Sequence, residues 1–146
     1  MKQFVILLIS VFYIITCKSQ DNSVSCKILN HFISDVKILD LFDIEISSKD
    51  TITIIDSCGS FENCAPFFSG QKKIILKHDV GKLNLDPNFR NDLNEWKNKV
   101  LIYKLVVYKS YYEIYFFYKP TNALGSVKYK IRSKKIVGIE YKLGQI

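Results

Sequence analysis

A stretch rich in β-branched and aromatic residues runs from Val100 to Leu143 and limits the possible folds of this chain more than any other segment. It reads VLIYKLVVYK, YYEIYFFYK, SVKYKIR and KIVGIEYKL, and short turn-like breaks separate the four pieces. Such residues pack well on a pleated surface, and short connections bring consecutive strands side by side in antiparallel order. The stretch therefore predicts a four-stranded antiparallel meander at the C-terminal end of the chain.

The two halves of this predicted sheet differ in how their side chains alternate. Apolar and polar residues alternate in the last two strands, so one face should be buried and the other wet. The first two strands, 102–107 and 112–118, are largely apolar on both faces. We expect helices to cover one side of these strands, and a ligand or a second copy of the chain to cover the other.

Upstream of the meander, apolar spacing predicts two helices. Ser23 or Ser25 can cap the first, which carries a stripe at helical intervals. The residues of this stripe are Leu29, Phe32, Ile33, Val36 and Leu39. Asp86 and Pro87 begin the second, since proline is tolerated in the first turn. Its apolar positions are Phe89, Leu93, Trp96 and Val100.

Three short strands are predicted between these helices. The alternating runs 42–46 and 51–55 flank a four-residue polar break, which is typical of a hairpin. Lys73–Lys77 is a further strand candidate. The whole pattern predicts an α+β domain in which amphipathic helices pack on a curved, mainly antiparallel sheet. Its element order resembles that of the cystatin and nuclear-transport-factor-2-like folds, where a helix lies in the concave face of the sheet; this resemblance implies a fold and no activity.

The N-terminus has the layout of a secretory signal peptide over residues 1–19, with Lys2 followed by an uncharged apolar run from Phe4 to Thr16. The run is short for a permanent membrane-spanning helix. Its end, Ile14-Ile15-Thr16-Cys17, resembles the lipobox of bacterial lipoproteins, which implies lipidation of Cys17. Cleavage after Ser19 is the alternative. Either route predicts export to the cell envelope or beyond, and leaves one globular domain over residues 20–146.

Three further cysteines are expected in a compartment where disulfides persist. Cys58 and Cys64 lie in one loop-like segment and are the preferred pair, although a bond from Cys26 to either of them is also consistent with the sequence. The cysteines and histidines are too scattered to suggest a zinc site. We therefore expect no metal and no cofactor.

Charge is distributed unevenly along the chain. Residues 100–146 carry nine basic and two acidic residues, whereas residues 20–99 carry ten basic and twelve acidic ones. A basic sheet face attracts acidic or anionic partners, and nucleic acid is not expected outside the cell. We predict a binding face of aromatic and basic side chains on the sheet. Its residues are Lys104, Tyr108, Tyr111, Tyr115, Phe117, Lys128, Lys130 and Arg132.

Two functions follow from these features. The favoured one is a non-enzymatic, exported interaction module, for example of the inhibitor or immunity type, that binds a protein or an anionic envelope component. Membrane attachment would then be through a lipid anchor only, and a homodimer is a further candidate assembly. The alternative is a small hydrolase or isomerase with its site inside the curved sheet, for which the candidate residues are His78, Asp79, Glu113 and Glu140. No catalytic motif accompanies these residues, so an enzyme is the less favoured function.

Overall fold

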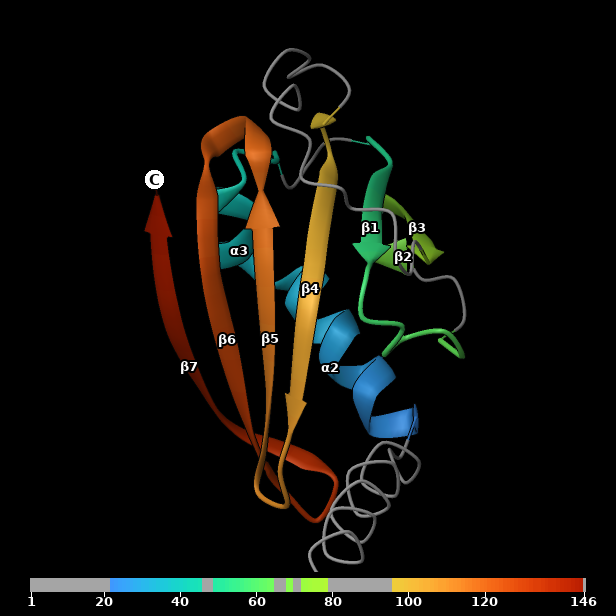
Figure 1. Ribbon diagram of the computed structural model, residues 1–146, viewed down its shortest axis with the longest axis vertical. Coiled ribbons are helices and arrows are strands. Elements are labelled where there is room, and N and C mark those ends of the chain that lie inside the picture. The colour runs from blue at the N-terminus through green and yellow to red at the C-terminus, as the bar shows by residue number, and fades with distance from the viewer. Residues whose placement is uncertain (1–21, 46–48, 65–67, 70–71, 79–95, 146) are drawn as a thin grey trace, which may run out of the picture.

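The computed structural model describes residues 22–45, 49–64, 68–69, 72–78 and 96–145. Its strands are β1 (Ile52–Asp56), β2 (Phe68–Ser69), β3 (Lys72–His78), β4 (Lys99–Val107), β5 (Tyr111–Tyr118), β6 (Ala123–Arg132) and β7 (Lys135–Gln145). They form one mixed sheet in the order β2-β3-β1-β4-β5-β6-β7. Two helices, α2 (Asn22–Ser34) and α3 (Val36–Leu41), lie against one face of it (Figure 1). The predicted α+β class is confirmed.

The predicted C-terminal meander is present. Strands β4, β5, β6 and β7 pair antiparallel in chain order. A 3₁₀ turn, η3 (Lys119–Thr121), joins β5 to β6, and Ser133 and Lys134 join β6 to β7. Both of these turn residues have positive φ, 49° and 61°, as the tight hairpin turns that match strand twist require.

The first half of the sheet differs from the prediction. No hairpin is formed by the runs 42–46 and 51–55 within the described residues: Phe42 ends α3, and only the second run forms a strand, β1. β1 pairs in parallel with β3 on one side and with β4 on the other. The apolar residues Phe42 and Ile44 alternate with polar ones because both apolar side chains enter the hydrophobic core. This segment is not paired with a strand.

The first predicted helix is divided into two. The side chain of Asp35 accepts a hydrogen bond from the backbone N–H of Lys37 (2.9 Å) and caps α3. Extended backbone at Asp35 ends α2 and redirects the chain, so Val36 is exposed rather than part of the buried stripe. Ile28 is fully buried in α2, although the predicted stripe omitted it.

The second predicted helix falls mostly outside the described residues. Of its stripe, only Trp96 and Val100 are described, and Val100 lies in β4, which begins at Lys99. The helix therefore cannot extend to Val100. The predicted signal peptide and Cys17 also lie outside the described residues. Within the described residues, no helix is long and apolar enough to span a membrane.

Aromatic side chains join the helices to the meander. The ring of Phe32 in α2 lies 5.2 Å from that of Phe116, measured between centroids. Phe42 lies 5.4 Å from Phe116 and 4.7 Å from Tyr118. Offset and edge-on contacts of this kind stabilise a core beyond the area that they bury. They fix the helices on one side of β5 and leave the other side of the meander facing away from them.

Candidate binding face on the meander

The outer face is defined as the side of the meander that faces away from α2 and α3. The register of the strands places its members side by side. They include Lys104, Val106, Tyr111, Glu113, Tyr115, Phe117, Leu124, Ser126, Lys128, Lys130, Glu140 and Lys142. Tyr103, at a register shift, joins them through its contact with the ring of Tyr115. In Figure 1 this face looks toward the viewer, with the helices behind it. Strand alternation therefore separates an aromatic and basic surface from the helix-covered core.

Lysine ammonium groups lie over tyrosine rings on the outer face. Lys128 Nζ is 4.4 Å from the centre of the Tyr111 ring, and Lys104 Nζ is 5.3 Å from that of Tyr115. These are cation–π distances. The ring of Tyr111 also stacks on that of Tyr108, with centroids 4.5 Å apart. The lysines thus hold aromatic surfaces in place while keeping positive charge at their margins.

A register shift between Ile102 and Lys104 widens the outer face. At this bulge Tyr103 and Lys104 both approach the ring of Tyr115, because a bulge sets two residues opposite one. The rings of Tyr103 and Tyr115 are 6.2 Å apart. Tyr103 remains 42% exposed, so part of its ring is accessible to solvent beside Tyr115.

A buried carboxylate lies beneath these side chains. Glu113 is almost inaccessible, and its Oε1 accepts a hydrogen bond from the hydroxyl of Ser126 (2.7 Å). Lys142 Nζ is 4.0 Å from the same oxygen. Burial, and then the charge of Glu113 and a hydrogen bond to it, raise the pKa of Tyr115. Glu113 therefore helps to orient the side chains of Ser126 and Lys142, which contact its carboxylate.

The second carboxylate of the outer face is neutralised by two lysines. Glu140 forms an ion pair with Lys130 and lies 3.9 Å from Lys128. The hydrogen bond from Lys130, followed by its charge, lowers the pKa of Glu140. Both glutamates of the outer face are thus already engaged by lysines, and the excess charge of the face is positive.

A shallow hollow opens in the outer face beside Tyr115. Its lining residues are Tyr103, Tyr115, Leu124, Gly125, Ser126, Lys142 and Leu143. A Cβ at Gly125 would lie 2.4 Å from the carbonyl oxygen of Lys142, so only glycine permits this approach of β6 to β7. The hollow combines an aromatic wall, exposed leucine side chains and one lysine. Aromatic side chains are enriched at protein interfaces, whose rims are polar.

The structure brings most of the predicted binding residues together. Strand pairing places Tyr111 opposite Lys130, and Tyr115 opposite Lys104. Tyr108 joins them through its stacking on Tyr111, and Phe117 lies opposite Leu101 and Leu124. Arg132 lies apart, at the β6–β7 hairpin end. The prediction missed Tyr103, Leu124, Ser126 and Lys142; the bulge that presents Tyr103 leaves no pattern in the sequence.

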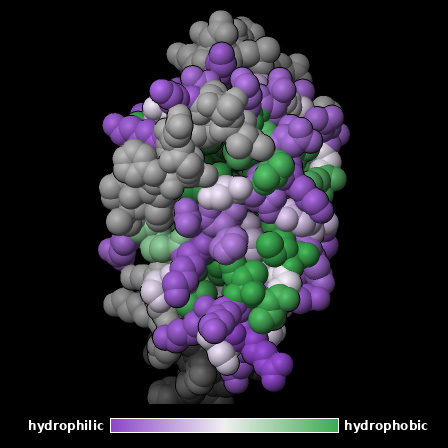
Figure 2. Space-filling view, turned by 180° about the vertical axis from the view of Figure 1, so that it is seen from behind, coloured by the Kyte–Doolittle hydropathy of each residue, from purple (hydrophilic) through white to green (hydrophobic). Residues whose placement is uncertain are grey.

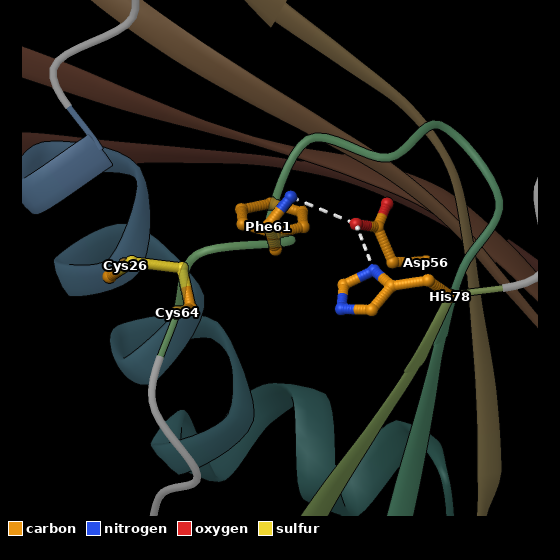
Figure 3. Close-up of a disulfide and its surroundings, with 5 residues drawn as sticks. All are labelled: Cys26, Asp56, Phe61, Cys64 and His78. Carbon is orange, nitrogen blue, oxygen red and sulfur yellow. Dashed lines mark hydrogen bonds and ion pairs between the residues drawn. A yellow bond between two sulfur atoms is a disulfide. The ribbon is translucent and has the colours of Figure 1, made fainter.

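A separate polar cluster lies at the end of β1. Asp56 is fully buried, and its Oδ2 accepts a hydrogen bond from the backbone N–H of Phe61 (2.8 Å) and lies 3.3 Å from His78 Nδ1 (Figure 3). Its Oδ1 accepts hydrogen bonds from Cys58 Sγ (3.1 Å) and from the N–H of Ser60 (3.3 Å). These contacts fold residues 57–61 around the carboxylate.

The cysteine prediction is corrected by the structure. Cys26 of α2 and Cys64 form the disulfide, with Cα atoms 5.4 Å apart, and Cys58 is a free thiol. The preferred Cys58–Cys64 pair is therefore wrong. Cys58 Sγ donates a hydrogen bond to Asp56, whereas the loop carries Cys64 to the helix (Figure 3). Burial is the main cause that raises the pKa of Cys58 to about 11, so this thiol is not an activated nucleophile.

The candidate catalytic residues do not converge. His78 lies at the end of β3 beside Asp56, whereas Glu113 and Glu140 lie on the outer face of β5 and β7. Strands β1 and β4 separate the two places in the sheet. Asp79 is outside the described residues. Across the described ranges, no three His, Cys, Asp or Glu side chains are grouped so that they could hold a metal ion.

No protein family, curated protein or solved structure matches the chain.

Proposed function

We propose that the protein is an exported, non-enzymatic binding module that holds an acidic partner protein on its outer face. The observation that carries this proposal is the hollow beside Tyr115, where exposed aromatic and leucine side chains lie next to lysines. An apolar patch supplies binding energy at a protein interface, and charges at its rim steer and select the partner. An inhibitor or immunity protein that neutralises an acidic target would be one form of such a module.

Three observations support an acidic protein as the partner. Tyr103 and Leu124 are 42% and 36% exposed, which suits the apolar centre of an interface. Lys104 and Lys128 are positioned over aromatic rings, so their charges are held at the margin of the same surface. Glu113 and Glu140 are already paired with lysines and add little repulsion to an incoming carboxylate.

The disulfide supports the exported part of the proposal. The Cys26–Cys64 bond joins α2 to the loop after β1, and such bonds persist in oxidising compartments outside the cytoplasm. The apolar run before Cys17 has the layout of a secretory signal. Lipidation of Cys17 would hold the domain at a membrane surface.

The proposal is tested by titrating the isotope-labelled full chain, purified in mild detergent, with defined probes. The first probe is a synthetic peptide of alternating glutamate and leucine, and the second is the same peptide with lysine in place of glutamate. We expect the acidic peptide alone to shift the NMR signals of Tyr103, Tyr115 and Leu124. Its binding should weaken as salt is added, because exposed charges are screened.

Matched variants separate site binding from general charge attraction. Lys104→Glu should weaken acidic-peptide binding by about tenfold, since it reverses a rim charge. Lys27→Glu makes the same charge change on the exposed side of α2 and should leave binding nearly unchanged. Equal effects of both variants would overturn the assignment of the face. Binding of heparin but not of the acidic peptide would overturn a protein partner in favour of an anionic glycan.

A further inference from the structure

The edge strand β7 is long and carries no strand on its outer side within the part of the chain that the structure describes. Its eleven residues pair with β6 only, and Figure 1 shows β7 running along one margin of the sheet. The opposite margin ends in β2, which has two residues. A long edge strand offers a row of backbone N–H and C=O groups to another strand.

Only part of β7 is regular enough for such pairing. The β6–β7 register shifts between Lys130 and Ile131, so that Val137 has no direct partner in β6. From Gly138 to Gln145 the ladder runs without interruption. Any further strand is therefore expected to pair with this regular segment, because a bulge bends a strand and disrupts pairing.

The exposed side chains of this segment are mixed in type. Strand alternation places Ile139, Tyr141 and Leu143 on the helix side and Glu140 and Lys142 on the outer face. Ile139 is 37% exposed and Leu143 is 40% exposed. The view from the helix side shows hydrophobic side chains exposed among polar ones over the lower half of the molecule (Figure 2). The edge is thus neither fully charged nor blocked by proline.

We propose that β7 pairs antiparallel with β7 of a second copy of the chain, in a register centred on Tyr141. Glu140 of each copy, which is half exposed and already pairs with Lys130 of its own chain, then lies opposite Lys142 of the other copy. This adds two complementary charge contacts on the outer face. Ile139 lies opposite Leu143 on the helix side, and Gly138 opposite Gly144. Directly opposed residues of this kind are the units that stabilise antiparallel sheets.

Neighbouring registers are excluded by charge. Centring the pair on Glu140 sets two glutamates opposite each other, and centring it on Lys142 sets two lysines opposite each other; like charges in this position are destabilising. A register centred between two consecutive residues would set outer-face side chains of one copy opposite helix-side residues of the other. Neither Glu140 nor Lys142 would then lie opposite a residue of opposite charge. The sequence of β7 is therefore complementary to itself in one register of the regular segment.

This register also determines the shape of the dimer. Residues of the same face lie opposite each other, so the two sheets join into one and the helices of both copies lie on the same side. The two outer faces become continuous across the two-fold axis, as expected for an interface made of one patch used twice. The proposal stands independently of what the outer face binds.

The test measures the mass of the full chain, in mild detergent, by native mass spectrometry over a concentration series up to about 1 mM. We expect a dimer that dissociates on dilution. Lys142→Glu alone and Glu140→Lys alone should each weaken it by on the order of tenfold to hundredfold, because each sets like charges opposite each other. The double variant Glu140→Lys with Lys142→Glu should restore dimerisation, because the charge pairs are rebuilt in reverse.

Hydrogen exchange provides a second measurement at the level of the backbone. Amide groups of residues 138–145 that point away from β6 should exchange more slowly as the concentration rises, while those of β4 remain unchanged. A chain that stays monomeric throughout overturns the proposal. So does a dimer that both single variants leave intact, since its interface would then lie elsewhere. Circular dichroism of each variant establishes that a loss of dimer is not a loss of fold.

Discussion

The hydroxyl of Tyr141, on the edge strand β7, donates a hydrogen bond to the carboxylate of Asp35, the residue that caps α3. The carboxylate of Asp35 also accepts a hydrogen bond from the backbone N–H of Lys37. Asp35 therefore links the beginning of a helix to a strand more than a hundred residues away. A helix of six residues is unstable in isolation, so α3 depends on this link and on its packing against the core.

Replacing Asp35 with alanine should destabilise the fold by about 2 kcal/mol, since it removes a helix cap and the hydrogen bond from Tyr141. Urea unfolding measures the loss. Asp40→Ala, which removes an exposed carboxylate of the same helix, serves as the control and should cost little. In a double-mutant cycle with Tyr141→Phe, we expect a coupling of about 1 kcal/mol. Additive effects would show that the two side chains do not interact.

Stability should fall as the pH becomes alkaline. Burial, and then the hydrogen bond to Asp35, raise the pKa of Tyr141 from its ordinary 10.0 to about 12. The folded protein thus holds this proton more tightly than the unfolded chain, so the stabilisation is complete below pH 10 and is lost as the pH rises through 12. Cys58, with its pKa raised from 9.0 to about 11, adds the same effect at a lower pH.

The measurement is the free energy of unfolding in urea from neutral pH to pH 12. Tyr141→Phe should make the decline above pH 10 less steep, because phenylalanine has no proton to lose. Cys58→Ser should do the same between pH 9 and pH 11. Unchanged slopes in both variants would mean that other groups cause the alkaline loss.

The disulfide should contribute substantially to stability. Its cysteines are 38 residues apart, and closing a loop of that size restricts the unfolded chain by about 4 kcal/mol. The double variant Cys26→Ser with Cys64→Ser should lose about that amount in urea unfolding. Cys58→Ser should be milder, because Cys58 is not cross-linked. Peptide mapping without reduction should join the peptides of Cys26 and Cys64; a bond between Cys58 and Cys64 would contradict the structure.

Asp56 should be the most sensitive polar residue of the described core. Asp56→Ala leaves the N–H groups of Ser60 and Phe61 without their acceptor in a buried place, and we expect a loss of about 3 kcal/mol or more. His78→Gln is the matched comparison. The His78 side chain is 31% exposed, so its contact with Asp56 should contribute about 1 kcal/mol or less. Thermal and urea unfolding would rank the two variants, and equal losses would mean that the loop hydrogen bonds add nothing beyond the contact with His78.

The meander could be predicted from sequence because its information is local. Four β-rich runs with tight breaks specify consecutive antiparallel pairs, and alternation specifies which side chains share a face. The proximity of Tyr111 to Lys128 followed from this pattern. Tyr103 did not, because the bulge at Ile102 and Lys104 depends on how two strands meet and not on the composition of either.

The parallel half could not be predicted in the same way. Thr53 pairs with Lys99, and Ile52 with Ile74; nothing near β1 specifies partners so distant in the chain. The polar break before Thr51 has the composition of a hairpin turn, and the sequence does not show that β1 pairs with strands far away in the chain. Asp56 had a local signal, a single carboxylate that ends an apolar strand just before Ser57 and Cys58. The burial of Asp56 and its contact with His78 depend on the pairing of β1 with β3.

The position of β1 between β3 and β4 has a consequence for how the protein acquires its structure. Each hairpin of the meander closes over a few residues, as where Tyr118 faces Ala123, and short loops close quickly. β1 has no neighbour until strands made later in synthesis are available on both sides. We therefore expect the order of folding to be opposite to the order of synthesis. The C-terminal strands should pair first, and the N-terminal half should then dock onto them.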